Sequence, residues 1–187
     1  MKIKTSKEEL ISLLKAWIAI SIAFAIILNS TSFTKSLLLS ALTVGVGFLL
    51  HELAHKFVAQ KYGCFAEFRS SDTMLLFAIL LAWAFGFVFA APGAVYIMGN
   101  VGIARNGRIS IAGPLTNLVL ASIFFPFKFL TSGFLLELAT YGFLINAWLA
   151  LFNLIPIWNL DGKKILNWNR NYYFIIVVIA ILFVFFL

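Results

Sequence analysis

The sequence predicts an all-α polytopic membrane protein with about five transmembrane helices, one re-entrant or hairpin element, and a short β-hairpin near the cytoplasmic face. Two observations support this fold class. The 187-residue chain is 63% hydrophobic and only 11% charged, whereas soluble domains are nearer half apolar and a quarter charged. Its apolar residues also gather in runs close to the ~20 residues that a helix needs to cross a bilayer.

A single membrane-embedded domain, residues 1–187, accounts for these runs, which leave no room for a separate soluble domain. We expect a central core at 36–162, with flanking helices at 10–28 and 172–187. The net charge is +7, from 14 basic and 7 acidic residues. The basic residues lie between the apolar runs rather than along one face, so they favour membrane orientation and no nucleic-acid partner.

The first apolar run, residues 10–28, follows a lysine-rich N-terminal segment and could be a signal peptide or an uncleaved span. The residues after it, Asn-Ser-Thr-Ser at 29–32, do not form a small-x-small cleavage site. Lys15 also interrupts the early part of the run. We therefore expect an uncleaved first transmembrane helix.

The remaining apolar runs cover residues 36–58, 74–98, 109–130, 133–155 and 172–187. The last run is short, but Trp168, Tyr172 and Tyr173 supply an aromatic anchor where it begins. Each run is expected to form a membrane helix except the one at 74–98.

The run at 74–98 could either cross the membrane or enter it and return. With the N-terminus in the cytoplasm, a re-entrant segment places 12 basic residues on the cytoplasmic side and 2 outside, whereas a full crossing gives 8 and 6. The positive-inside rule favours the re-entrant alternative. Gly86, Pro92 and Gly93 supply the backbone breaks that such a segment needs. At the end of this run, residues 94–97 are predicted to pair with residues 103–109 as the short β-hairpin.

Ionisable residues stand inside the second apolar run, as the sequence His51-Glu52-Leu53-Ala54-His55. On a helix the two histidines project from one face and can bind one zinc ion, and Glu52 stands where such sites carry a general base. A packed pair of polar residues is the plainer alternative. Three ionisable groups within five residues of a span disfavour it, because charge at membrane depth is costly and usually functional.

Asp161 is the candidate third ligand, in the sequence Asn153-x-x-Pro156-x-x-x-Leu160-Asp161-Gly162. As an Asp-Gly pair it could also be a simple turn residue. His51 lies ~22 Å along the second run, in its inner half. A re-entrant segment at 74–98 would bring Asp161 to that same side. Cys64 is the only cysteine, which excludes a cysteine-based zinc site.

The two motifs, in this order and about a hundred residues apart, resemble the site-2 protease family of intramembrane zinc metalloproteases (peptidase family M50). A third element between them, Ala112-Gly113-Pro114-Leu115-Thr116-Asn117, is similar to that family's Gly-Pro-x-x-Asn element. Together they make the core at 36–162 the catalytic core. The sequence departs from the family in lacking a PDZ or CBS domain, and in carrying Trp158 where many members have a second proline.

The resemblance implies a role for each matching residue. One zinc ion per chain would be bound by His51, His55 and Asp161, with Glu52 as the catalytic base. Asn153 would be a second catalytic residue that positions the substrate or the developing oxyanion. Asn117 is a weaker candidate for substrate binding, because the element could serve helix packing alone.

The expected function is therefore intramembrane zinc-dependent endopeptidase activity on transmembrane segments of membrane-anchored substrates, as in regulated intramembrane proteolysis. The expected partners are a transmembrane protein substrate and the lipid bilayer. We expect a multi-pass protein of the cell membrane with a cytoplasmic N-terminus and the active site towards the cytoplasmic side. The alternatives are a zinc-binding or transport protein that uses the same residues without hydrolysis, and a catalytically silent relative that only captures membrane helices.

Overall fold

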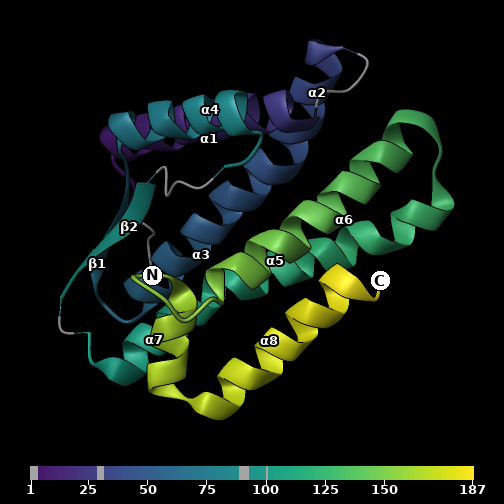
Figure 1. Ribbon diagram of the computed structural model, residues 1–187. Coiled ribbons are helices and arrows are strands. Elements are labelled where there is room, and N and C mark those ends of the chain that lie inside the picture. Colours follow the sequence, from purple (N-terminus) through teal and green to yellow (C-terminus); the bar gives the residue numbers. More distant parts are fainter. Residues whose placement is uncertain (1–3, 29–31, 89–92, 100) are drawn as a thin grey trace.

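The computed structural model describes residues 4–28, 32–88, 93–99 and 101–187, and it is mainly helical (Figure 1). The helices are α1 (Lys7–Leu28), α2 (Phe33–Ser40), α3 (Val46–Lys61), α4 (Asp72–Phe85), α5 (Ile103–Leu130), α6 (Gly133–Asn153), α7 (Asp161–Trp168) and α8 (Arg170–Phe185). A π-helical segment, η1 (Ala41–Gly45), joins α2 to α3 without a break. The strands are β1 (Phe65–Ser70) and β2 (Gly93–Met98).

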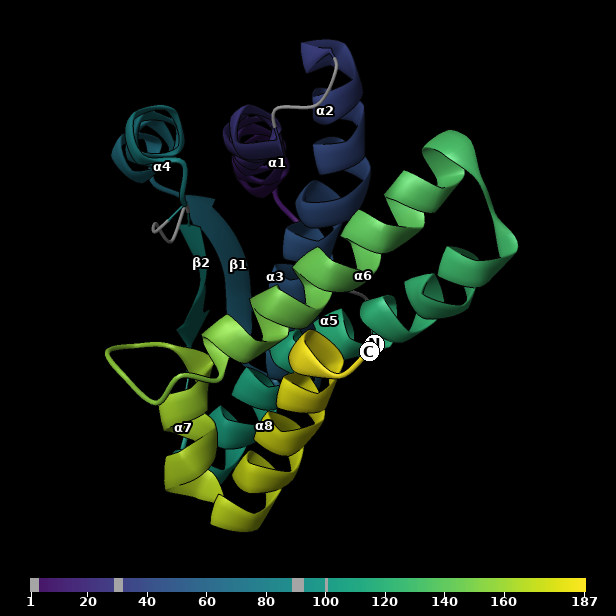
Figure 2. The same cartoon turned by 45° about the vertical axis from the view of Figure 1, so that its right-hand side comes forward.

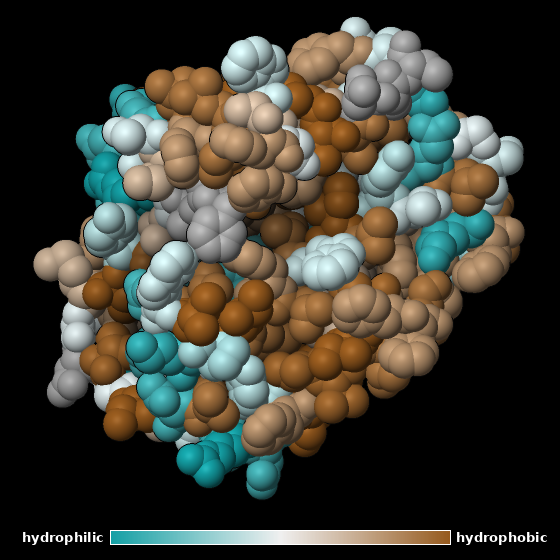
Figure 3. All heavy atoms as spheres, in the orientation of Figure 1, coloured by the Kyte–Doolittle hydropathy of each residue, from teal (hydrophilic) through white to brown (hydrophobic). Residues whose placement is uncertain are grey.

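Four helices among the described residues are long and apolar enough to cross a membrane: α1, the continuous helix Phe33–Lys61, α5 and α6. The apolar helices α4 and α8 are shorter, at 14 and 16 residues. Large apolar side chains such as Trp83, Phe129 and Leu130 are more than two-thirds exposed. Figure 3 shows that apolar residues cover much of one face, with hydrophilic residues gathered mainly along its margins. The prediction of a mainly helical chain with membrane-length helices is confirmed, whereas the number of about five spans stays a prediction.

The two strands form an antiparallel sheet in which Phe65 pairs with Met98 and Ser70 with Gly93. The predicted hairpin is therefore wrong in its second strand. Residues 94–97 do lie in a strand, but their partner is β1, and residues 103–109 form the first turns of α5. The buried residues Gly107, Ser110, Gly113 and Asn117 recur at intervals of three or four, which is a helical repeat that a seven-residue window does not reveal.

The apolar run at 74–98 is divided between α4 and β2 rather than forming one long helix. Gly86 ends α4 in the left-handed conformation, with φ of 69°, which glycine adopts at low cost. Helix α4 lies beside α1 (Figure 2). Because Met98 pairs with Phe65, the chain returns beside the point at which it left α3. The predicted break at Pro92 lies outside the described residues.

Helices α5 and α6 pack along each other, with α7 against α5 and α8 against α6 (Figures 1 and 2). Buried apolar residues join these four helices into one cluster: Leu118, Ala150, Leu154, Ile165, Tyr173, Ile176 and Ala180. This packing holds the start of α7 against α5 and the end of α6.

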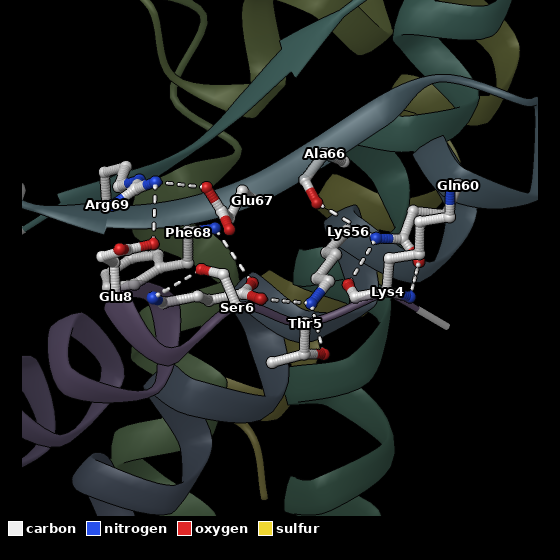
Figure 4. A network of polar contacts seen from close by, with 11 residues as sticks. Lys4, Thr5, Ser6, Glu8, Lys56, Gln60, Ala66, Glu67, Phe68 and Arg69 are labelled. Carbon is white, nitrogen blue, oxygen red and sulfur yellow. Dashed lines mark hydrogen bonds and ion pairs between the residues drawn. The ribbon is translucent and has the colours of Figure 1, made fainter. Parts of the chain in front are cut away.

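The N-terminal segment is bound to α3 and β1 by a buried polar network, shown in Figure 4. At its centre is an ion pair between Lys56 Nζ and Glu9 Oε2 at 2.5 Å, with both side chains fully buried. Lys56 also donates to Thr5 Oγ1, and the backbone N–H of Phe68 donates to the other oxygen of Glu9. Because every charged atom at this centre has a partner, the network fastens three separate segments together.

The same network continues along β1. Gln60 donates to the carbonyl oxygens of Lys4 and Ala66. Hydrogen bonds from Ser6 and from the Arg69 guanidinium hold the pKa of the Glu67 carboxyl below its ordinary value. The edge of β1 that faces away from β2 is therefore occupied by side chains.

Candidate metal centre

Helix α3 presents His51 and His55 on one face, one turn apart, as the sequence spacing predicts. Both side chains are buried, at 4% and 8% exposure, and their ring centroids lie 4.7 Å apart. The residues before them form a continuous apolar helix, so the two imidazoles are held inside a membrane-length segment. Ligands held this way need little rearrangement to bind an ion.

Asp161 is the first residue of α7, and its Oδ2 lies 3.3 Å from His51 Nε2 and 3.0 Å from His55 Nε2. The ligand atoms of these three residues all lie within 4.8 Å of one another, and they form the group that could hold a metal ion among the described residues. The structure thus brings together three predicted ligands from positions 110 residues apart in the sequence.

The position of Asp161 depends on a close turn between α6 and α7. A Cβ atom on Gly162 would collide with the backbone carbonyl of Leu154, so glycine is required where α7 begins against the end of α6. Ile165, one turn later, is fully buried in the cluster that joins α5, α6 and α8. The packing of α7 therefore directs Asp161 towards α3.

Gly113 of α5 faces the imidazole nitrogens that point towards Asp161. A Cβ atom at this position would collide with Nε2 of both His51 and His55. A glycine here leaves space beside two nitrogen ligands and one carboxylate oxygen. Two histidines and a carboxylate fit catalytic zinc, which takes three protein ligands and keeps a fourth position open.

The remaining ring nitrogens are held by hydrogen bonds. His55 Nδ1 lies 2.8 Å from the carbonyl oxygen of Ile109, which can only accept, so Nδ1 carries the proton and Nε2 offers its lone pair to a metal. His51 Nδ1 lies 2.5 Å from Asn117 Oδ1. Each histidine is therefore held by a hydrogen bond at Nδ1, while its Nε2 faces Asp161.

Glu52 lies on α3 beside the first histidine and is 9% exposed. Its carboxylate makes no hydrogen bond or ion pair with the part of the chain that the structure describes. A nearly buried carboxylate without a protein partner keeps its oxygens available to water or to a substrate.

The two predicted asparagines differ in their surroundings. Asn153 is the last residue of α6, half-buried, and donates to the carbonyl oxygen of Leu149 in its own helix at 2.9 Å. Within the described residues it makes no polar contact with the three predicted ligands. Asn117 is fully buried and hydrogen-bonded to His51. This position suits a residue that orients a metal ligand better than one that contacts a substrate.

Sequence reasoning did not single out Asn146 or the close approach of Gly113 to the histidines. Asn146 lies on α6, is fully buried, and accepts a hydrogen bond from Asn117 at 2.9 Å. A lone amide inside an apolar run was the available signal, because a polar side chain at membrane depth needs a partner.

Comparison with known proteins identifies curated relatives, although no family model and no solved structure match the chain. MJ0611 of Methanocaldococcus jannaschii, named a candidate zinc metalloprotease, is 44% identical over 135 residues, which are 71% of this chain and 71% of the relative. YwhC of Bacillus subtilis, with the same designation, is 32% identical over 149 residues, or 67% of this chain and 66% of the relative.

A longer relative matches over a similar stretch. Zinc metalloprotease MJ0392 of Methanocaldococcus jannaschii is 34% identical over 128 residues, which are 65% of this chain but 31% of the relative. This chain therefore spans about two-thirds of YwhC, somewhat more of MJ0611, and under a third of MJ0392. The similarity to these relatives, together with the convergence of His51, His55 and Asp161, shows that the chain belongs to the site-2 protease family of zinc metalloproteases.

Proposed function

We propose that this protein is an intramembrane zinc metalloendopeptidase that cleaves transmembrane segments of membrane-anchored proteins. The observation that carries the proposal is that Asp161 meets His51 and His55, which lie on a membrane-length helix, beside the unpartnered carboxylate of Glu52. The names of the relatives support zinc-dependent proteolysis, and the apolar surface supports a site within the bilayer.

In this mechanism His51, His55 and Asp161 would hold one zinc ion, because both Nε2 atoms and a carboxylate oxygen converge there. Bound zinc would supply a Lewis acid and a water nucleophile that is available near neutral pH. Glu52 would act as the general base that takes a proton from the attacking water and then returns it, as general acid, to the leaving amine. Asn153 has two amide N–H groups and uses one on Leu149, so the second can donate to the developing oxyanion.

The substrate must expose a backbone carbonyl, so its helix has to open locally. The two-stranded sheet offers a means of pairing the freed backbone groups. The outer edge of β1 is already occupied, because its backbone is hydrogen-bonded to the side chains of Gln60 and Glu9. Among the described residues β2 pairs only with β1, so its other edge can take an added strand. We propose that the opened substrate segment pairs along β2.

Orientation in the cell membrane follows from the charge distribution. Basic residues cluster where α3 ends and where α5, α7 and α8 begin: Lys61, Arg105, Arg108, Lys163, Lys164 and Arg170. Lys4 lies at the same end, beside Gln60. Lys35 and Lys128 lie near the opposite helix ends. By the positive-inside rule this distribution supports our proposal that the N-terminus and the proteolytic site lie towards the cytoplasm and that residues 74–98 are re-entrant.

The test is cleavage of model membrane substrates by purified protein in liposomes, with wild type, Glu52→Gln and chelator-treated samples side by side. Glu52→Gln keeps the shape of the side chain but removes the base, so cleavage should fall by at least about 10²–10⁴-fold. One zinc ion per chain should still be bound. Undiminished cleavage by Glu52→Gln would refute the mechanism. The transport alternative requires instead that zinc flux across the liposome membrane survive this substitution.

Asn153→Ala tests the proposed oxyanion donor in the same assay. Loss of one such donor lowers kcat by about 10²–10³-fold, and zinc content should not change because Asn153 does not contact the ligands. If kcat is unchanged, the oxyanion donor must be another group.

A further inference from the structure

A pair of fully buried amides, Asn117 of α5 and Asn146 of α6, lies behind the first histidine. We infer that Asn146 is a positioning residue that acts through Asn117 to hold His51 in the tautomer whose Nε2 binds zinc. This inference rests on the zinc site of the proposed function and assigns a role to a residue outside that site.

The direction of every hydrogen bond in this group follows from one backbone carbonyl. Asn146 Nδ2 lies 2.8 Å from the carbonyl oxygen of Gly142, which can only accept, so this end of the amide must be the donor. Asn146 Oδ1 then has to accept from Asn117 Nδ2, at 2.9 Å. The orientation of Asn146 thereby determines which end of Asn117 faces it.

A second carbonyl enforces the same orientation of Asn117. Its Nδ2 lies 3.2 Å from the carbonyl oxygen of Gly47 on α3, which takes the second N–H. With both N–H groups used, Asn117 presents Oδ1 to His51 Nδ1 at 2.5 Å. Since an amide oxygen can only accept, His51 Nδ1 must carry the proton, and Nε2 is left with a lone pair directed towards Asp161.

The opposite orientation of Asn117 is excluded by repulsion. A flipped amide would set its oxygen against two acceptors, the Gly47 carbonyl and Asn146 Oδ1, and its N–H groups against His51. Because both asparagines are fully buried, water is not at hand to repair such mismatches. His55 reaches the equivalent state through one backbone carbonyl, whereas His51 depends on side chains from two other helices.

The amide of Asn146 lies at a close contact between α3 and α6. A Cβ atom on Gly47 would collide with Asn146 Oδ1, so α3 approaches α6 closely at this point. A residue that both fits this contact and directs Asn117 couples the position of α6 to the orientation of a zinc ligand on α3.

The experiment measures zinc affinity of the purified full chain in detergent by competition with a chromophoric chelator. The variants are Asn117→Leu, Asn146→Leu and the double variant, and Thr43→Val is the matched control. Thr43 is also buried, but its hydroxyl donates to Leu39 in its own helix and has no link to His51. Loss of a partner behind a zinc ligand typically weakens binding about 10–100-fold, which is the expected range for Asn117→Leu.

Asn146→Leu should weaken binding less, by about tenfold or below, because the Gly47 carbonyl still directs Asn117. If Asn146 acts through Asn117, the double variant should bind zinc no more weakly than Asn117→Leu alone. A purely structural role would make the two losses multiply. Thr43→Val should bind zinc as wild type does. The d–d absorption of the cobalt-substituted protein provides a second readout, which should change in Asn146→Leu but not in Thr43→Val.

Multiplying losses, or wild-type affinity in Asn146→Leu, would overturn the inference. If Asn146→Leu does not fold, Asn146→Ser replaces it in the same cycle with the same criteria. His51→Ala distinguishes a failure of the proposed zinc site from a failure of the positioning role. Wild-type zinc affinity in His51→Ala would refute the proposed zinc site itself, whereas its loss, with no effect of Asn146 substitution, would refute the positioning role alone.

Discussion

Helix α3 carries two buried polar clusters, the His51, His55 and Asp161 group and the Lys56–Glu9 network. Both are shielded from solvent, and His55 of the metal group is followed directly by Lys56 of the network. The Lys56–Glu9 network contains its own cation and anion, each with further hydrogen bonds. The metal group instead brings the Nε2 atoms of two histidines and a carboxylate oxygen together, and Lys164 lies 4.0 Å from the other oxygen of Asp161.

The difference shows that burial and charge alone do not mark a functional site. A functional site is marked instead by the arrangement of its hydrogen-bond donors and acceptors. Where the chain supplies both partners, the cluster joins segments of the fold. Where ligand atoms converge, with the opposite ring nitrogens already committed to other acceptors, the cluster can hold a metal ion.

The largest effect on stability is expected from breaking the self-contained cluster. Lys56→Met leaves the Glu9 carboxylate buried without its cation, which should lower the free energy of unfolding by about 3–5 kcal/mol. The measurement is denaturant unfolding of the zinc-loaded protein in detergent. Adding Glu9→Leu to Lys56→Met should restore part of the loss, because it removes the stranded charge. A double variant less stable than Lys56→Met would contradict this account.

A smaller effect is expected from emptying the metal cluster. Chelation should lower the free energy of unfolding by about 2.7 kcal/mol relative to protein with free zinc at 100 times the dissociation constant. Restoring zinc should restore the stability. If zinc has no effect on unfolding, the folded state does not bind it selectively.

Gly113→Ala should remove this zinc-dependent part of the stability, because its Cβ would occupy the space beside both Nε2 atoms. Gly102→Ala is the matched control, since Gly102 is the N-cap residue of the same helix, α5, and a Cβ there meets nothing within 4 Å. Zinc titration of unfolding compares the two variants. Equal zinc responses would show that Gly113 does not border the ion.

The smallest effect is expected from an ion pair of the same type that is exposed. Lys35 Nζ lies 2.7 Å from Glu137 Oε1, with side chains 32% and 38% exposed. Lys35→Ala should change the free energy of unfolding by only about 0–1 kcal/mol, because solvent screens such pairs. A loss as large as that of Lys56→Met would show that burial does not explain the difference between the two pairs.

The parts of the fold and site that could be predicted depend on short-range patterns. The apolar runs gave the main helices because membrane length and hydrophobicity are local properties. The exception was residues 103–109, where a short apolar window with glycines resembled a strand although the residues begin a long helix. The pairing of β2 with β1 joins residues 23 to 33 positions apart, from Ser70–Gly93 to Phe65–Met98, and no local pattern reports it.

By itself, the sequence determined that this is a helical membrane protein and that His51 and His55 share one helix face, because helix geometry dictates the i, i+4 relation. Motif order, through resemblance, also indicated Asp161. Only the tertiary structure decided that Gly113 leaves room beside the histidines, that Asn117 and Asn146 stand behind His51, and that Glu9 neutralises Lys56. The physical reason is that these contacts join residues far apart in the chain, whose approach is set by the packing of helices against one another.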